Sequence, residues 1–253
     1  MRQHWMKWLR IEPGEGAAVG WAFAYFFLLL ACYYILRPLR DEMGIAGGIN
    51  KLPWVFTGTF IAMLAVVPLF GLITARLPRR IFLPLVYGFF ILNLLLFHAA
   101  FQFEAWRAIT ARAFFIWVSV FNLFVVSVFW SFMVDLFTSR QSKRLFGLIA
   151  AGGTAGAISG PAITVLLVAP LGTVNLLLLA ALLLAGTLLC IGRLGRWSAQ
   201  RSSAPMSAAQ EPLGGSILAG LTLIVRSPYL LGVALFMLLF TTLSTFLYFE
   251  QAH

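Results

Sequence analysis

Long apolar runs separated by short polar connections constrain the fold of this chain more than any other feature of its sequence. A helix needs about 20 apolar residues to cross a hydrocarbon core of about 30 Å. The runs reach about this length and are continuous rather than alternating, which argues against a β-barrel. The sequence predicts seven membrane-spanning helices: Ala17–Leu36, Pro53–Ala75, Ile81–Phe101, Ala113–Val134, Leu145–Ala169, Thr173–Gly192 and Tyr229–Phe249.

The composition is that of a chain surrounded by lipid. It is 61% hydrophobic and 10% charged, whereas a soluble domain has about 25% charged residues. The first run is longer than the ~7–15 apolar residues of a signal peptide, so we expect it to remain as a helix. We therefore predict an all-α, polytopic membrane protein in contact with the lipid bilayer.

The net charge of +10 is explained by topology rather than by nucleic-acid binding. With a cytoplasmic N-terminus, most Lys and Arg residues fall on the cytoplasmic side, which is the asymmetry that orients membrane helices. These residues are Arg2, Lys7, Arg10, Arg76, Arg79, Arg80, Arg140, Lys143, Arg144, Arg193, Arg196, Arg201 and Arg226. We expect an integral protein of a bacterial inner membrane, with its N-terminus in the cytoplasm and no nucleic-acid partner.

The residues of common catalytic and metal sites are absent or scattered. Cys32 and Cys190 lie in different spans, and His4, His98 and His253 are far apart in the sequence. The chain has no Gly-rich phosphate loop and no nucleophile elbow. We therefore expect no enzyme activity, no metal and no cofactor.

The order of the segments indicates a two-halved transporter. Residues 1–192 form a six-helix half with a tight turn at Pro170–Gly172, residues 193–228 form a polar cytoplasmic linker, and residues 229–253 begin a second half. Transporters of this layout place their site between the two halves. We expect that most of the second half is missing from this chain; the alternative is a half-transporter that pairs with another copy.

The stretch "GLITARLPRR", Gly71 to Arg80, resembles the loop between the second and third helices of the major facilitator superfamily. In that superfamily the charges of the loop hold the inward gate, and this chain has Ala75 where the superfamily has an aspartate. The alternative is an ordinary basic loop that obeys the positive-inside rule. The residues that match the superfamily are Gly71, Arg76, Arg79 and Arg80.

Glycines recur every four residues in the fifth predicted span. Gly152, Gly156 and Gly160 share one helix face, which lets two backbones approach closely in lipid. Pro161 follows and is expected to bend the helix. The segment "GAISGP" resembles the GxxxGP of major facilitator antiporters; the simpler interpretation is a packing seam without substrate contact.

The fourth predicted span carries polar residues. Asn122 lies near mid-membrane, where an amide needs a partner or a wet cavity, and Asn93 in the third span is a candidate partner. Asp135 closes the span, and we expect it to form an ion pair with a basic residue such as Arg140 or Arg144. These residues either hold helices together or contact a solute.

The stretch "CYYILRPLRDE" places charge beside an apolar run. On a helix, Tyr33, Arg37 and Arg40 fall at i, i+4 and i+7, with Asp41 alongside. Pro38 is expected to break or kink the helix, and broken helices are frequent at transport sites. The alternative is that the arginines and tyrosine anchor the helix end at the membrane surface.

This same stretch resembles the end of the first helix in the nucleotide transporter family, the ATP/ADP translocases, which is a distant relative of the major facilitator superfamily. Ile35, Leu36, Arg37 and Asp41 match, and Arg40 stands at the position of a family lysine. "LPWVF" (52–56) and "FWSFMVDLFTSRQSKRLFGLIAAGG" (129–153) are also similar to the family. The resemblance implies that Arg40 contacts the substrate, although the family glutamate of the fourth helix has no counterpart between residues 112 and 135.

We therefore predict a major-facilitator-like secondary transporter that moves a small anionic solute, such as a nucleotide, by alternating access and antiport. The alternatives are a proton-coupled carrier of another solute and a non-transporting membrane partner or sensor. The expected substrate-binding residues are Tyr33, Arg37, Arg40, Asp41, Arg112 and Asn122.

Overall fold

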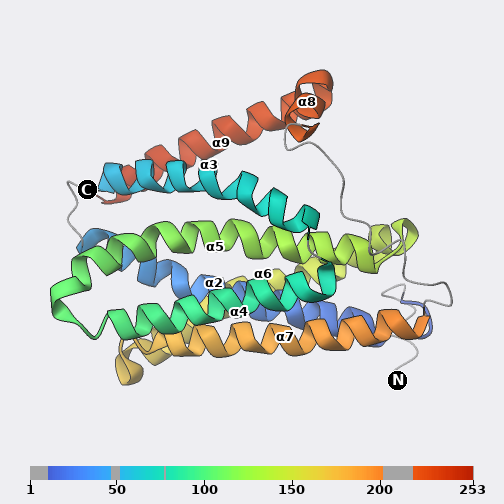
Figure 1. The fold of residues 1–253 in the computed structure, drawn as a ribbon, viewed down its shortest axis with the longest axis horizontal. Helices are drawn as coiled ribbons and strands as arrows, with labels where there is room; N and C mark the ends of the chain where they lie inside the picture. The colour runs from blue at the N-terminus through green and yellow to red at the C-terminus, as the bar shows by residue number, and fades with distance from the viewer. Residues whose placement is uncertain (1–10, 47–51, 77, 202–218, 253) are drawn as a thin grey trace.

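The computed structural model describes residues 11–46, 52–76, 78–201 and 219–252, which are helical apart from short connections (Figure 1). Over these residues no strand occurs, so the predicted all-α class is confirmed. The elements are α2 (Gly16–Ala46), α3 (Leu52–Arg76), α4 (Arg79–Ala100), the short 3-10 helix η2 (Glu104–Trp106), α5 (Arg107–Leu136), α6 (Ser139–Leu171), α7 (Leu176–Arg201), α8 (Ala219–Arg226) and α9 (Pro228–Ala252).

Each predicted span coincides with one long helix. Within the described residues, six helical segments are long and apolar enough to cross a membrane, and these belong to α2, α4, α5, α6, α7 and α9. The remaining predicted span corresponds to α3, which contains the shorter apolar stretch Trp54–Pro68. The helices therefore fit a membrane bundle, as the apolar runs predicted.

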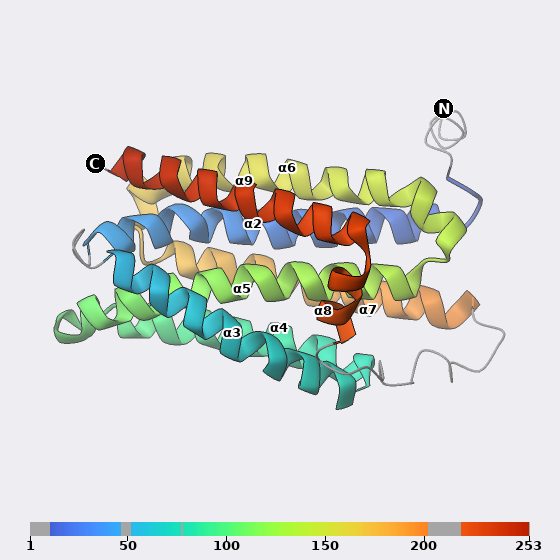
Figure 2. The ribbon, with the colours of Figure 1, turned by 90° about the horizontal axis from the view of Figure 1, so that it is seen from above.

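The long helices run back and forth along one axis, so the connections gather at two ends of the molecule (Figures 1 and 2). We call one the Arg40 end, where α2 finishes and where the α4–α5 and α6–α7 connections lie. The opposite end, where α2 begins and α5 connects to α6, is called the Glu15 end. The two ends carry different charged clusters.

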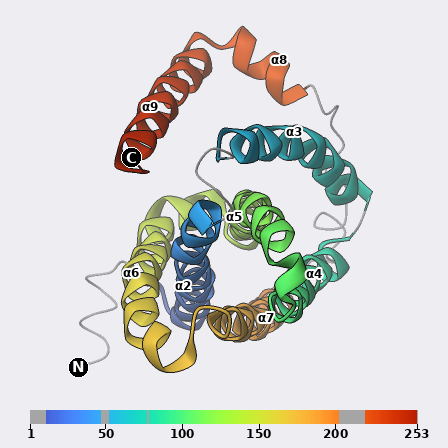
Figure 3. The same ribbon diagram turned by 90° about the vertical axis from the view of Figure 1, so that its left-hand side faces the viewer.

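Helix α2 is the centre of the bundle and packs against α5, α6 and α7. Viewed along the helices, it lies among these three, while α4 packs against α7 and α5 (Figure 3). Helix α3 packs against α5, and α8 and α9 stand apart from the other helices when the bundle is viewed end-on in Figure 3. The central position of α2 means that polar groups on α2 meet several helices at once.

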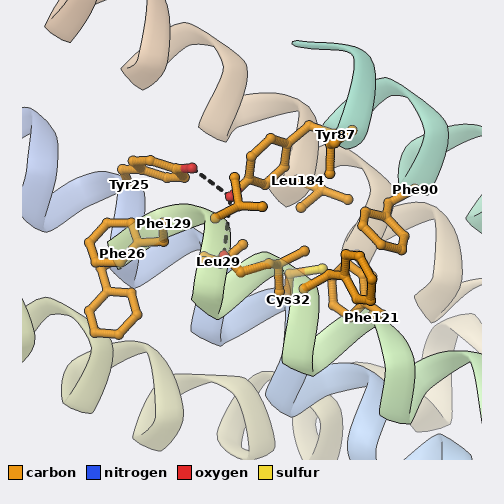
Figure 4. Close-up of a cluster of buried hydrophobic side chains, with 14 of the residues drawn as sticks. Tyr25, Phe26, Leu29, Cys32, Tyr87, Phe90, Phe121, Phe129 and Leu184 are labelled. Carbon is orange, nitrogen blue, oxygen red and sulfur yellow. Dashed lines mark hydrogen bonds between the residues drawn. The ribbon is translucent and has the colours of Figure 1, made fainter. Parts of the chain in front are cut away.

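Aromatic side chains fill the core around α2 (Figure 4). Phe26 stacks on Phe129 of α5 with ring centroids 4.2 Å apart. The hydroxyl of Tyr25 donates to that of Tyr87 on α4, and the Tyr87 hydroxyl donates to the carbonyl of Val125 at 3.5 Å. The buried hydroxyls are therefore satisfied inside an apolar core, which removes much of the cost of burying them.

The contact between α2 and α6 depends on glycine. A Cβ atom added at Gly152 would lie 2.5 Å from the carbonyl oxygen of Phe23, and one added at Gly156 would collide with the carbonyl oxygen of Phe27. Gly160 also lies against α2. The two backbones thus approach as closely as small-residue seams in lipid allow.

Two of the prolines that lie inside helices were expected to interrupt or bend them. Helix α2 continues through Pro38 to Ala46, so a break at Pro38 is wrong, while a kink there stays a prediction. Helix α6 likewise continues through Pro161 to Leu171. Both proline side chains are exposed, and membrane helices tolerate the loss of one backbone donor because neighbouring helices hold the segment in place.

The connections differ in part from the predicted ones. The turn at Pro170–Gly172 is confirmed, since α6 ends at Leu171 and Gly172 has φ 78°, a conformation that favours glycine. The predicted linker at 193–228 is helical at both described ends, since α7 extends to Arg201 and α8 forms before α9, and its residues 202–218 lie outside the described part of the chain. The indole N–H of Trp197 donates to the carbonyl of Gly14 at 3.0 Å, which holds the end of α7 against the start of α2.

Candidate functional site

The guanidinium of Arg40 forms the best-defined polar cluster at the Arg40 end. Its Nε and Nη2 both donate to Oδ1 of Asp41, at 2.9 and 2.7 Å. Its Nη1 donates to Oγ of Ser119 on α5 at 3.5 Å, and its carbon lies 4.9 Å from the ring centroid of Phe115. The Arg40 side chain is 16% exposed, so this cation is held between α2 and α5 rather than spread on the surface.

Arg37 lies one turn earlier on α2, but it does not join this cluster. Its side chain is exposed, and its guanidinium carbon lies 5.9 Å from the ring centroid of Tyr34. Tyr34 packs on Gly160 of α6, whereas Phe115, the ring beside Arg40, belongs to α5. The two guanidiniums lie near different rings, and their joint action on a solute stays a prediction.

A second cation lies on the α5 face that meets Arg40. Arg112, Phe115 and Ser119 follow each other at i, i+3 and i+7, which places them on one side of the helix. Arg112 is half-buried, its Nε is buried without a hydrogen-bond partner, and no ion pair with it occurs among the described residues. Its Nε is thus a donor that no described group of the protein uses.

The remaining predicted contact residues surround this cluster less closely. Tyr33 is half-buried and its ring centroid lies 5.1 Å from that of Tyr34. Asn122 is half-buried one turn beyond Ser119 on α5. Asn93 donates to the carbonyl of Phe89 in its own helix at 2.7 Å, so the pairing of Asn93 with Asn122 that we considered is not formed.

The predicted gating loop is mostly helical. Gly71 and Arg76 belong to α3, and Arg79 and Arg80 begin α4. The side chains of these four residues lie outside the described part of the structure. A gating role for them stays a prediction.

The Glu15 end holds a charge cluster that the sequence patterns did not single out. Arg144 of α6 donates to both carboxylate oxygens of Glu15, at 2.9 and 2.8 Å, and its Nη1 lies 2.9 Å from a carboxylate oxygen of Glu12. Gln141 donates to Glu15 at 2.7 Å, and Arg140 lies 3.8 Å from Glu12. The cluster joins the start of α2 to the start of α6.

Glu15 is held ionised by this cluster. Burial of the carboxyl group opposes ionisation, but hydrogen bonds from Gln141 and the backbone N–H of Glu12, together with Arg144, outweigh it and lower the pKa of Glu15 below its usual 4.5. A signal was present in the sequence, since two glutamates precede the first span and a basic segment follows the fourth on the same side. The expected ion pair was instead assigned to Asp135, whereas Arg144 forms ion pairs with Glu12 and Glu15.

Comparison of the chain with protein-family models, curated proteins and solved structures gave no match. Among the described residues, no group of His, Cys, Asp and Glu side chains could hold a metal ion. The chemistry that the arrangement offers is thus the binding of negative charge by Arg40 and Arg112, with Ser119 and Phe115 beside them.

Proposed function

We propose that this chain forms the helix bundle of a secondary active transporter that moves a small anionic solute by alternating access. The observation that carries the proposal is the guanidinium of Arg40, which lies between two membrane-length helices with Asp41, Ser119 and Phe115 around it. Charged side chains within membrane segments are costly, almost always face the bundle interior or a water-filled cavity, and mark solute or ion pathways.

The charge of the cluster favours a small anion. Asp41 offsets one of the two cations, Arg40 and Arg112, so the cluster has a formal net charge of +1 (two arginines minus one aspartate). A nucleotide carries more negative charge than this cluster offsets. A mono- or dianionic carboxylate or phosphate therefore fits these residues better than the nucleotide that the family resemblance implies.

The α2–α6 contact suits a bundle whose helices shift during transport. Glycines at 152, 156 and 160 present a smooth face to α2, without side chains that interlock. Arg40 lies near one end of α2 and the Glu15–Arg144 pair near the other. We propose that rocking motions open the Arg40 end while the Glu15 end is closed by its ion pairs.

An uptake assay with the full chain in proteoliposomes tests this function. Labelled inorganic phosphate, succinate and ATP are compared under counter-exchange, with Arg40→Gln as the test variant and Arg37→Gln as the matched control. A hydrogen bond to a charged group contributes about 1.5–3 kcal/mol, so Arg40→Gln is expected to lower uptake of the preferred anion about tenfold or more. Arg37→Gln removes an exposed cation and is expected to retain uptake.

Two results oppose the proposal in different ways. Uptake of every anion at the level of protein-free liposomes would favour a non-transporting membrane partner. Equal activity of Arg40→Gln and the wild type would remove Arg40 from the solute pathway. Thermal unfolding of both variants checks that the losses are not due to misfolding.

A further inference from the structure

We propose that Asp41 determines the anion selectivity of this site by acting as a tethered competitor for Arg40. In this role Asp41 admits oxyanions that offer several acceptor oxygens, such as phosphate or a carboxylate, and refuses halide ions. The inference rests on the anion-transport function proposed above and names the class of anion that the same site takes.

The geometry of the ion pair supports this role. Nε and Nη2 form the side edge of the guanidinium, which is the edge that binds a carboxylate or phosphate in a bidentate manner. A single oxygen of Asp41, Oδ1, accepts from both nitrogens at 2.9 and 2.7 Å. The best anion-binding edge of Arg40 is thus already occupied by one acceptor atom.

Asp41 has an advantage over any free ion because it is the next residue in the chain. A tethered group has a high effective concentration and needs no loss of translational freedom to bind. A free anion that offers only one point of contact would replace the Asp41 oxygen with an equivalent contact and gain nothing. Halide ions are therefore expected to compete poorly for Arg40.

An oxyanion can gain what a halide cannot. In this proposal one oxygen of the oxyanion replaces that of Asp41, and the others bond to donors that Asp41 leaves unused. Nη1 of Arg40 makes only a long bond of 3.5 Å to Ser119, and Nε of Arg112 is buried without a partner on the same face of α5. The additional hydrogen bonds outweigh the advantage of the tether, and this sets the selectivity.

Among the described residues, Asp41 is the carboxylate bonded to Arg40, and the other carboxylates at this end, Glu42 and Glu104, are exposed. The charged and titratable groups near Asp41 on α2 are Arg37, Arg40, Tyr33 and the exposed Glu42, and on the facing side of α5 the cation is Arg112. Among the described residues, the parts of α3, α6 and α7 at the Arg40 end carry no charged residue. Asp41 is the acidic residue that accepts hydrogen bonds from the Nε–Nη2 edge of the Arg40 guanidinium.

A binding measurement on the full chain in nanodiscs tests the inference. Inorganic phosphate and succinate are titrated calorimetrically at low and at high chloride. Asp41→Asn keeps the shape of the side chain and removes its charge, and Glu42→Gln is the matched control, because it makes the same charge change at the neighbouring exposed position. Asp41→Ser and the thermal unfolding midpoints show whether any change arises from misfolding.

The wild type is expected to bind phosphate or succinate with little competition from chloride. Asp41→Asn is expected to bind the same anion about tenfold more tightly at low chloride, a factor that corresponds to about 1.4 kcal/mol, and to lose this gain at high chloride because halide now competes. Glu42→Gln should behave like the wild type, which separates the effect from general screening.

The outcomes distinguish this inference from the transport proposal. If Asp41→Asn keeps the affinity and chloride sensitivity of the wild type, Asp41 is not the selectivity residue, although the anion site stands. If chloride displaces phosphate from the wild type as readily as from Asp41→Asn, the tethered-competitor role is refuted. If neither anion binds to the wild type or to the variants, the anion site and the proposed function both fail.

Discussion

Glu15 and Arg144 form the most enclosed ion pair among the described residues, with side chains 2% and 16% exposed. Their charges are taken out of water, so each depends on the other, and Glu12 and Gln141 add further bonds. Such a pair is costly to break because the remaining charge stays enclosed. This pair is therefore expected to contribute to the stability of the bundle.

Glu15→Gln is predicted to lower the free energy of unfolding by about 2 kcal/mol at pH 7, because it removes a charged hydrogen bond while Glu12 still neutralises Arg144. The control is Glu104→Gln, since Glu104 is 92% exposed in its pair with Arg107, and an exposed pair contributes about 0–1 kcal/mol. Thermal unfolding of the purified chain measures both variants. An unchanged midpoint for Glu15→Gln at pH 7 would show that the pair does not stabilise the fold.

The same pair predicts a pH dependence with a definite sign. The folded-state pKa of Glu15 is lowered from its usual 4.5, so the folded protein binds fewer protons at this site than the unfolded chain. The stabilisation is complete above the unfolded value and is lost as the pH falls through the lowered pKa. The difference in midpoint between the wild type and Glu15→Gln should shrink in that acidic range; a difference that grows on acidification would contradict the assignment.

Residue-level predictions from the sequence were partly correct because helix periodicity does not identify the neighbour of each face. Tyr33, Arg37 and Arg40 were expected to share one stripe; Arg37 lies 5.9 Å from the ring centroid of Tyr34 and Arg40 lies 4.9 Å from that of Phe115. The guanidinium of Arg40 pairs with Asp41, as the spacing suggested. The Glu15–Arg144 pair joins positions more than a hundred residues apart, and no local pattern contains that contact.

At the scale of helices, the glycines of α6 that face α2 make the closest contacts of any described glycine in the bundle. A Cβ atom at Gly156 would collide with the backbone of α2, whereas Gly147 on the same helix has open space around it. The same helix therefore contains one glycine where a side chain does not fit and one where a side chain would fit.

Gly156→Ala is predicted to destabilise the chain by about 1–3 kcal/mol, because the added methyl forces α2 and α6 apart. Gly147→Ala is the control and is expected to be neutral or stabilising by up to about 1 kcal/mol, since alanine favours the helix. Thermal unfolding in detergent compares the two. A Gly156→Ala midpoint equal to that of Gly147→Ala would mean that the seam is looser than described.

The existence and order of the helices could be predicted because the length of an apolar run is set by the bilayer. Helix ends were harder to predict, since a helix can continue past the apolar segment when side chains support it. Helix α7 reaches Arg201 with Trp197 bonded to Gly14, although its polar residues suggested a linker. Helix α2 likewise continues past Pro38, whose side chain lies on an exposed face.

For the whole molecule, charge is concentrated at the two ends and the core between them is aromatic. Arg40, Asp41 and Arg112 lie at one end and the Glu15–Arg144 pair at the other, while Tyr25, Phe26 and Phe129 pack between them. Helix α2 runs through all three regions. A movement of α2 relative to its neighbours would therefore change both ends together, as alternating access requires.

The central claim is that the Arg40 cluster faces a water-filled path that an anion can enter, and cysteine accessibility at Ser119 tests it most directly. Ser119→Cys in the full chain, in nanodiscs, is treated with a charged, membrane-impermeant thiol reagent in the presence and absence of phosphate or succinate. The native Cys32 and Cys190 are buried, so the wild type sets the background. Ile158→Cys, at a 70% exposed apolar position on α6, is the control for a site that faces lipid.

The account predicts that the Ser119→Cys variant is modified well above the wild-type background, that the solute anion slows this modification, and that the Ile158→Cys variant is not modified. Modification of Ser119→Cys no faster than that of Ile158→Cys, or at a rate that neither anion changes, would contradict a solute path at Arg40.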